Sequence, residues 1–367
     1  MTKRILVSGY YGYNNIGDEA ILKGLVDGIS SKTDAQLVIL SKNPDWTTAK
    51  YKVKSVNRSK LSTIIKEVKK ADMVLLGGGS LLQDVTSKKS IIYYLGILML
   101  GILFKKKTFI YSQGIGPIRL KRNRYLTKKI LSKVDFINVR DNQSHRELKE
   151  LGINREVLVT TDTVFGINKV GKDCGREILE KLSVDPKKKN ICFTIMNWKN
   201  YGDQTVDKVS KLIELIFKER TDVNIILVPF FYHLDLAIER KIYNRLKPVF
   251  EDLYILEDYL HVKEYLSLIS NMDLMLSMRL HGLIFATLTG AYPIGISYDP
   301  KIDGFIKELD RVQRYYVEDF DENMLAEEIL NSLDNLESLK EETAAHLDKF
   351  YKLTNIHNEA VARVINS

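Results

Sequence analysis

Short apolar runs alternate with longer amphipathic stretches along most of the chain. The short runs are typical of buried strands in a parallel sheet, and the stretches between them repeat their apolar positions with a helical period. The predicted strands are 5–8, 36–40, 72–76, 108–113, 136–139, 157–162, 191–195, 223–229, 253–256, 272–276 and 293–297. Helices are expected over 59–70, 91–104, 121–133 and 142–151, and from Glu19, Val206, Leu234, Val262 and Leu283 onward. This alternation predicts parallel sheets with right-handed crossovers, whose ligand loops gather at the carboxyl ends of the strands.

The length of 367 residues favours two domains, because single hydrophobic cores stop growing at smaller sizes. We expect an α/β protein with two Rossmann-like, doubly wound domains that face a cleft. The predicted boundaries are 1–167 for the N-terminal domain, 168–189 for a linker and 190–340 for the C-terminal domain. The remaining segment, 341–367, is helix-periodic and long enough to cross back to the first domain.

Composition is that of an ordinary globular protein, with 45% hydrophobic and 28% charged residues. The net charge of +8 is modest for this length, and we find no nucleic-acid-binding module. The lysine clusters 105–107 and 187–189 have two interpretations. They are either solvated surface residues or sites that attract an acidic substrate or an anionic membrane. The apolar run 91–104 is too short to span a bilayer, so it is either a buried crossover helix or a face lying on lipid.

Two features concern location and redox chemistry. Cys174 and Cys192 lie far apart without a CxxC pair, which argues against a disulfide framework or a zinc site. The chain enters a strand directly after Met1, which leaves no room for a signal peptide and predicts a cytoplasmic protein, peripheral to the membrane at most.

Glycine-rich loops follow three strands of the first half. The loop 9–18 does not match the dinucleotide pattern GxGxxG, and Asp18 is well suited to cap the helix that follows. Three consecutive glycines at 77–79 favour backbone lying against a ligand over a crowded turn. A third loop, 113–117, follows the next long strand.

The turn from Leu276 to Gly282 carries the strongest candidate chemistry. Arg279 and His281 lie where a strand ends and a helix begins, and the free N–H groups of a helix N-terminus attract anions. Arginine adds a bidentate fork for carboxylate or phosphate, and histidine adds an acid that titrates near neutral pH. The turn is therefore predicted to combine anion binding with acid catalysis.

Six motifs together resemble the polysaccharide pyruvyltransferases, most closely the bacterial cell-wall type. They are Gly9–Ala20, Gly77–Asp84, Gln113–Pro117, Arg140–Asp141, Arg279–His281 and Ser297–Lys301. The resemblance implies a fold similar to the B-type glycosyltransferases. It also implies transfer of the enolpyruvyl unit of phosphoenolpyruvate to two hydroxyls of one sugar, as a 4,6-type ketal, with release of phosphate. The implied acceptor is a lipid-linked saccharide containing N-acetylmannosamine, and neither a metal nor a cofactor is needed.

Roles follow for individual residues. His281 is the expected acid, with Asp18 or Glu19 as the base; Asp18 could equally be only a cap. The expected donor-binding residues are Arg279, Leu280, Gly282, Lys199 and Asn197. The second domain would hold the donor and the first the acceptor. The expected acceptor or cleft residues are Asn15, Gly17, Glu19, Gly77, Gly78, Gly79, Ser80, Gln83, Gln113, Gly114, Arg140, His233, Asp235, Tyr298 and Asp299.

One position departs from the family pattern. Met196 stands where the family often carries a donor-holding arginine, and Lys199 supplies a point charge rather than a fork. The alternatives are a nucleotide-sugar glycosyltransferase of the same architecture and a non-catalytic, polymer-binding relative.

Overall fold

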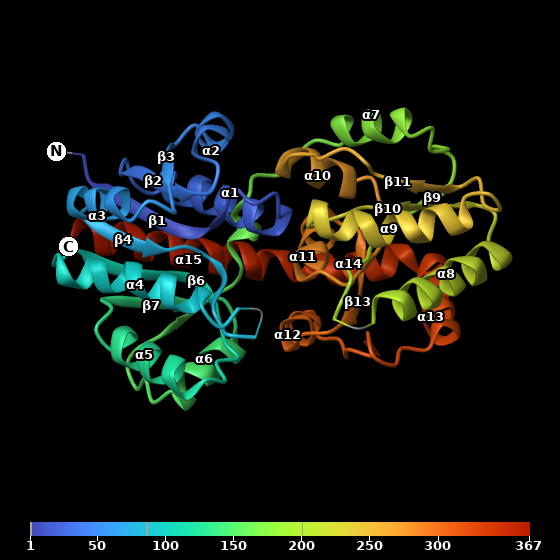
Figure 1. Ribbon diagram of the computed structural model, residues 1–367. Helices are drawn as coiled ribbons and strands as arrows, with labels where there is room; N and C mark the ends of the chain where they lie inside the picture. Colours follow the sequence, from blue (N-terminus) through green and yellow to red (C-terminus); the bar gives the residue numbers. More distant parts are fainter. Residues whose placement is uncertain (1, 86, 200) are drawn as a thin grey trace. The chain divides into compact units, whose positions relative to one another are not determined.

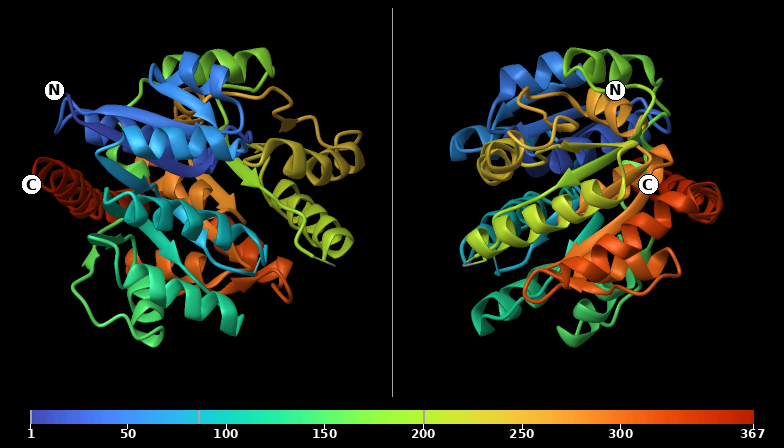
Figure 2. Two further views of the ribbon diagram at one scale, coloured as in Figure 1. Left: turned by 60° about the vertical axis from the view of Figure 1, so that its left-hand side comes forward. Right: turned by 90° about the vertical axis from the view of Figure 1, so that its right-hand side faces the viewer.

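The computed structural model describes residues 2–85, 87–199 and 201–367, which fold into two compact α/β units (Figures 1 and 2). The first unit contains residues 1–168 and 349–367, and the second contains 169–348. Each unit is built on its own parallel sheet, as the alternation of strands and helices predicts.

The sheet of the first unit has eight described strands, all parallel. Their spatial order is β3 (Lys54–Asn57), β2 (Gln36–Ser41), β1 (Arg4–Tyr11), β4 (Met73–Leu76), β6 (Lys107–Ile115), β7 (Phe136–Val139) and β8 (Leu158–Val159), with β5 (Gly79–Leu82) paired to β6. The helices are α1 (Ile16–Ser30), α2 (Pro44–Tyr51), α3 (Leu61–Lys70), α4 (Ser90–Leu103), α5 (Lys121–Leu131) and α6 (Asn142–Glu150), with a 3₁₀ turn at Thr163–Gly166.

The C-terminal helix α15 (Leu347–Asn366) packs on this first unit, so both chain ends lie there (Figure 1). Phe350 stacks on Phe165 with ring centroids 4.3 Å apart. His357 is fully buried and its Nδ1 lies 3.0 Å from the Thr160 hydroxyl. Helix α15 is amphipathic, and the burial of its aromatic and polar side chains on one face explains why it packs on the first unit.

Helix α4 resolves the two interpretations of the apolar run 91–104. Ile91, Leu95 and Leu98 are at most 2% exposed, and the helix packs against β4, β5 and β6. It is a crossover helix whose apolar side covers the sheet, although Leu103 at its end is 67% exposed. Among the described residues, no helix is both long and apolar enough to cross a membrane.

The second unit has a six-stranded parallel sheet among its described residues. The order is β11 (Leu253–Ile255), β10 (Val223–Leu227), β9 (Lys189–Thr194), β12 (Leu274–Ser277), β13 (Tyr292–Ser297) and β14 (Tyr315–Tyr316). Its helices are α7 (Asp173–Lys181), α8 (Gly202–Glu219), α9 (Tyr232–Leu246), α10 (Val262–Ile269), α11 (Leu280–Thr289), α12 (Pro300–Glu308), α13 (Glu322–Asp334) and α14 (Leu336–Ala345). Helices α8 and α13 pack side by side (Figure 2).

Three local predictions differ from the structure. The segment 168–189, expected as a linker, carries α7, which packs against α10 and belongs to the second unit. Helix α1 begins at Ile16 with Asn15 as its cap, so Asp18 lies inside the first turn and is not the cap. The pattern also gave no signal for α2, β3 or β5, because short elements with few apolar residues carry little periodicity.

Candidate active site

The turn between β12 and α11 is fixed by one serine hydroxyl. Ser277 Oγ accepts a hydrogen bond from the Arg279 N–H at 2.9 Å and donates to the Arg279 carbonyl at 2.8 Å. A Cβ on Gly282 would lie 2.3 Å from the same Oγ, so only glycine leaves room for the hydroxyl. Arg279 is consequently held as the extended residue that caps α11.

A buried carboxylate orients the Arg279 side chain. Arg279 Nε donates to Asp235 Oδ2 at 3.1 Å, and Arg279 Nη2 donates to Asp235 Oδ1. The Phe231 N–H also donates to Asp235 Oδ2, at 2.8 Å. This side-on pair occupies one edge of the guanidinium and leaves Nη1 on the other edge outside the pair. Burial alone would lower the Arg279 pKa, but Asp235 and Tyr298 outweigh that effect and raise it, so the charge is kept.

Asp235 was predicted to line the cleft and to contact sugar or phosphate, and its burial corrects that prediction. Its side chain is fully buried and both oxygens accept hydrogen bonds from within the second unit. It lies one turn into α9, where it joins the end of β12 to the helix N-terminus. Asp235 therefore positions Arg279 and does not reach a ligand itself.

The sequence analysis missed a second buried acid, Glu239, one turn further along α9. Its Oε1 accepts a hydrogen bond from the Ile195 N–H at 3.0 Å, at the end of β9, and its side chain has no exposure. Burial, and then repulsion from Asp235, raises the pKa of Glu239 well above its usual value, so we assign it as the neutral acid. The i, i+4 spacing of Asp235 and Glu239 on a face with Leu236 and Ile242 was the available signal.

The other predicted donor-side residues surround the same strand ends. His281 is half-buried in the first turn of α11, directly after Leu280, which opens the helix. Met196 carries no charge; its side chain is 6% exposed and packs in the core of the second unit. Lys199 Nζ lies 4.7 Å from the Trp198 ring centre, and Trp198 packs on Tyr298 with centroids 4.4 Å apart.

Three further predictions concern exposed or capping positions in the second unit. Asn197 and His233 are exposed, and His233 contacts Tyr232 edge to face. Asp299 accepts a hydrogen bond from the Lys301 N–H at 3.0 Å and caps α12. Capping of α12 is therefore a structural role of Asp299 that accounts for an aspartate at this position of the motif.

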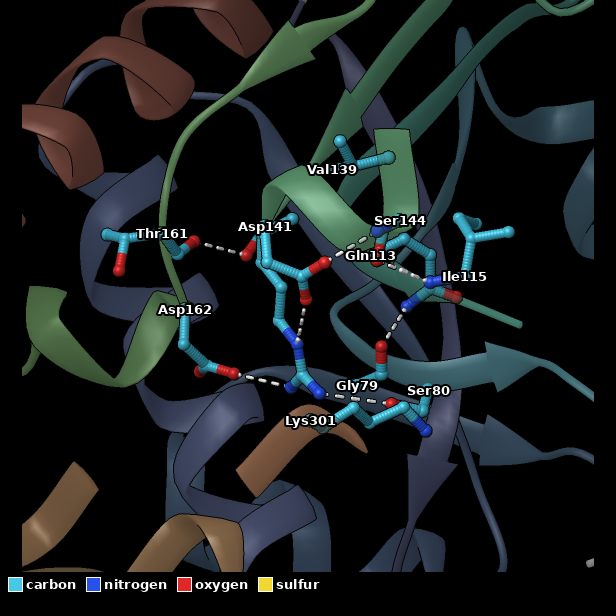
Figure 3. Close-up of polar contacts among 12 residues, drawn as sticks. Gly79, Ser80, Gln113, Ile115, Val139, Asp141, Ser144, Thr161, Asp162 and Lys301 are labelled. Carbon is cyan, nitrogen blue, oxygen red and sulfur yellow. Dashed lines mark hydrogen bonds and ion pairs between the residues drawn. The ribbon is translucent and has the colours of Figure 1, made fainter. Parts of the chain in front are cut away.

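In the first unit, Arg140 is the centre of a polar cluster at the carboxyl end of β7. Figure 3 labels its partners Ser80, Asp141 and Asp162. Its Nη1 donates to Asp162 Oδ2 at 2.7 Å and its Nη2 donates to Ser80 Oγ at 3.1 Å. Asp141 Oδ2 lies 3.5 Å from Arg140 Nε, and the Arg140 side chain is only 5% exposed. A Cβ on Gly114 would lie 3.1 Å from this guanidinium, so the glycine gives Arg140 its space.

The glycine run 77–79 is explained by packing within the first unit, which overturns the ligand interpretation. A Cβ on Gly77 would lie 2.2 Å from the Tyr11 hydroxyl, and one on Gly78 would lie 2.9 Å from Ile21. Gly79 has a φ of +97°, a conformation that side chains rarely adopt. Gln113 Nε2 then donates to the Gly77 carbonyl at 2.8 Å and to the Gly79 carbonyl at 2.9 Å. Figure 3 shows the bond to Gly79.

The N-terminus of α1 separates the two candidate bases. Glu19 is 1% exposed and accepts from the Gly12 N–H and the Tyr51 hydroxyl, both at 2.7 Å, so it is a structural group and not the base. Burial raises the pKa of Glu19 to about 7. Asp18 is half-buried in the same first turn, and Asn15 caps the helix by accepting from the Gly17 N–H at 3.2 Å. Gln83, half-buried, accepts from the Val85 N–H at 2.7 Å.

A buried arginine surrounded by tyrosines was also missed. Arg58 is 7% exposed; its guanidinium carbon lies 4.7 to 5.9 Å from the ring centres of Tyr10, Tyr13, Tyr93 and Tyr94. Its Nη1 donates to the Gly9 carbonyl at 2.6 Å. The tyrosines at 10–13 and 93–94 were visible in the sequence, but only the tertiary fold brings them around Arg58.

Solved structures with similar folds share the two-unit architecture. They include the MnaA–UDP complex from S. aureus (TM-score 0.68, 13% identity, 98% of this chain and 95% of that chain). They also include the UDP-GlcNAc 2-epimerase of Neisseria meningitidis bound to UDP-GlcNAc (TM-score 0.65, 15% identity, 98% and 100%) and HepE of Anabaena in complex with UDP (TM-score 0.64, 10% identity, 100% and 100%). At these identities the likeness concerns the fold, which is of the B-type glycosyltransferase class.

Sequence comparisons give the family. The amylovoran biosynthesis protein AmsJ of Erwinia amylovora is 20% identical over 407 residues, covering 94% of this chain and 96% of AmsJ. The sequence model of the polysaccharide pyruvyl transferases matches residues 15–300, a span that contains Asp18, Arg140, Arg279 and His281. Most of the chain is thus accounted for by one family of transferases: the protein belongs to the polysaccharide pyruvyl transferases.

Proposed function

We propose that the protein transfers pyruvate from phosphoenolpyruvate to a sugar of a cell-wall or extracellular polysaccharide precursor, forming a 4,6-type ketal and releasing phosphate. The observation that carries the proposal is the turn at 277–282. There Asp235 fixes the Arg279 guanidinium side-on, at the N-terminus of the helix whose first turn bears His281. Phosphoenolpyruvate carries a carboxylate and a phosphate, and an oriented fork beside helix N–H groups suits both anions.

The chemistry assigns one role to each group. His281 gives a proton to the methylene carbon of the enol phosphate, so that the C=C electron pair forms a C–H bond and C2 becomes oxocarbenium-like. A sugar hydroxyl adds to C2 and loses its proton to a base, for which Asp18 is the remaining candidate. Phosphate then leaves and takes up the proton held by the base. A second hydroxyl of the same sugar adds to C2, passes its proton to His281, which restores the acid, and closes the ketal. A positioned general acid contributes on the order of 10²–10⁴-fold to such a proton transfer.

The remaining assignments belong to the same proposal. In the second unit, Lys199 and Asn197 extend the donor site near Met196, which replaces the family's usual arginine. In the first unit, Asn15, Gly17, Ser80, Gln83 and Arg140 flank the acceptor, a sugar or a lipid-linked saccharide presented at the inner face of the membrane. Neither a metal nor a cofactor takes part in this scheme.

A nucleotide-sugar glycosyltransferase is the second candidate, favoured by Met196. The lost arginine fork weakens the case for a donor with both carboxylate and phosphate. A non-catalytic polymer-binding relative is the third.

One assay separates the three candidates. The purified protein is incubated with phosphoenolpyruvate and acceptor, and phosphate and the ketal product are followed. Acceptor-dependent phosphate release supports pyruvyl transfer. Nucleoside diphosphate release from a sugar nucleotide in its place supports the second candidate, and acceptor binding without either product supports the third.

A further inference from the structure

Helix α5 presents a row of cations to solvent. Lys121, Arg122, Lys128 and Lys129 are all exposed, and their spacing puts them on one face of the helix. Tyr125 lies in the middle of that face and is 62% exposed, with Lys129 Nζ 5.9 Å from its ring centre. We call these five residues, with the exposed Lys133 just beyond the helix, the α5 face.

The charge of the α5 face is not balanced by its surroundings. From Arg119 to Val134 the chain has seven basic residues and no acidic one. Arg124 forms an ion pair on the inner side of the helix, where its Nη1 lies 3.3 Å from Glu147. Within the described parts of the chain, none of the five cations of the α5 face has an ion pair. The segment 318–342, by contrast, has ten acidic residues and one basic residue, so basic and acidic residues are concentrated in different parts of the chain.

This arrangement works against the stability of the isolated helix. Lys121 and Arg122 stand in its first turn, where the positive end of the helix dipole disfavours cations, and no acidic residue occupies that turn. Oppositely charged residues four positions apart stabilise a helix, whereas like charges at that spacing destabilise it. An unbalanced row of this kind is therefore best explained by an anionic partner outside the chain.

The face is also rigidly held. The Asp84 carboxylate accepts from the N–H groups of Arg119 and Leu120, at 2.8 and 2.9 Å, and so holds the segment that leads into the helix. On the opposite side, Thr127 and Leu131 are fully buried. At the rim of the first unit, α5 packs beside α4 (Figure 1). The helix that carries the cations is therefore already folded and packed before it meets a partner.

We propose that the α5 face docks the protein on an anionic phospholipid surface. Lysine and arginine near such a surface are each attracted by its negative potential, and tyrosine favours the level of the lipid headgroups. A patch of cations around one aromatic ring suits a flat, laterally mobile layer of charges. This docking rests on the proposed function, because a protein that modifies a lipid-linked acceptor must reach that acceptor at the membrane.

The site differs from the one that the sequence suggested. The lysines at 105–107 follow α4, whose apolar side is occupied by the sheet. Leu103 is the exposed apolar residue beside those lysines, whereas the α5 face surrounds an exposed aromatic ring with five cations.

The test uses the full-length protein and vesicles without substrates. Sedimentation with vesicles of about 30% phosphatidylglycerol in phosphatidylcholine should capture the protein, and pure phosphatidylcholine vesicles should not. Capture should fall at least about tenfold in Arg122→Glu/Lys129→Glu, since two of the five cations are reversed. The matched control is Lys66→Glu/Lys70→Glu, which reverses two exposed lysines of α3 in the same unit and should bind like the wild type.

Tyr125→Ala distinguishes a lipid surface from a soluble polyanion. It should weaken vesicle capture several-fold and leave retention on heparin unchanged. The proposal is overturned if the wild type ignores the anionic vesicles, if both double variants bind equally, or if a duplex DNA competitor binds more tightly than the vesicles. Pyruvyl transfer to a water-soluble acceptor, measured in parallel, should be unchanged in Arg122→Glu/Lys129→Glu. Failure of that activity in the wild type would count against the proposed function and not against docking.

Discussion

At the scale of single residues, the site depends on side chains whose partners are buried and distant in sequence. Arg279 and Asp235 are separated by 44 positions, yet they form a two-pronged ion pair at the strand ends. Arg140 likewise reaches Asp162 and Ser80 from different elements. Each arginine is oriented by a buried acid, so the chemistry of the site depends on the residues behind it.

His281→Ala tests the proposed acid. We expect kcat for pyruvyl transfer to fall about 10²–10⁴-fold, because the methylene carbon loses its proton donor, while the thermal unfolding midpoint stays within error. The half-buried position of His281 in the first turn of α11 gives no packing reason for unfolding. Near-normal turnover in this variant would remove His281 from the mechanism.

Asp235→Asn and Glu239→Gln separate the charged from the neutral member of the acid pair. Asp235→Asn should raise KM for phosphoenolpyruvate at least about tenfold, or ~1.4 kcal/mol, because the guanidinium loses its ionic anchor. Glu239→Gln should change KM little, since an amide resembles the neutral acid and still accepts from the Ile195 N–H. Equal effects of the two substitutions on KM, with both proteins folded by circular dichroism, would contradict the assignment.

At the scale of elements, the helices begin where a polar side chain or a glycine permits a sharp turn from strand to helix. Asn15 caps α1, Asp141 caps α6 and Asp299 caps α12. In the turn before α11, Ser277 takes over this role and Gly282 makes room for it. The position of Arg279 is thus a consequence of how closely α11 approaches β12.

Gly282→Ala tests that close approach. The added Cβ would lie 2.3 Å from Ser277 Oγ and 2.8 Å from Met275, so the turn must shift. We expect a loss of about 1–3 kcal/mol in unfolding free energy and a lower affinity for phosphoenolpyruvate. Gly96→Ala is the control, because its Cβ meets nothing within 4 Å on α4; this change should stabilise by about 0.5–1 kcal/mol. Denaturant titrations of both variants decide whether the space at Gly282 is needed.

At the scale of the whole molecule, buried titratable groups connect stability to pH. Burial lowers the pKa of His357, on α15, to about 3, and burial raises the pKa of Glu19, on α1, to about 7. For His357 the folded pKa lies below the unfolded value of 6.5, so its contribution is fully present above pH 6.5 and is lost as the pH falls toward 3. For Glu19 the folded pKa lies above the unfolded value of 4.5, so its contribution is present below 4.5 and is lost as the pH rises through 7.

The two effects can be separated by urea titrations across pH. From pH 4.5 to 3, stability should fall in the wild type by up to about 1.4 kcal/mol per pH unit more than in His357→Gln. From pH 7 down to 4.5, the wild type should gain stability relative to Glu19→Gln. Parallel curves for the wild type and either variant would show that the corresponding group does not titrate on unfolding.

Much of the fold was predictable because hydrophobic periodicity is a local property. The buried strands β4, β6, β9 and β12 are short apolar runs bounded by glycine or polar residues, and the structure has them within a few positions of their predicted ends. The parallel order follows from the helices between them. Short elements such as β5 were missed because the glycines at 77–79 indicate a loop, whereas pairing with β6 makes part of that loop a strand.

The site was predictable only in part, for a related reason. The sequence identified Arg279 and His281 because strand, turn and helix are consecutive there. It assigned Glu19 and Asp235 to ligand contact, although both carboxyl groups are occupied inside the protein. It did not find Glu239 or Arg58, whose neighbours come from other elements. Sequence motifs therefore locate the loops of a site more reliably than they divide its residues between ligand contact and support.

The sequence by itself determined the class of this protein, because the alternation of buried strands with amphipathic helices and the family's motifs are written in consecutive residues. Only the tertiary structure decided which charged groups face solvent, which are neutralised in pairs and which glycines exist to make room for a neighbour. The physical reason is that desolvation and close packing depend on atoms brought together from distant parts of the chain, and no local pattern records them.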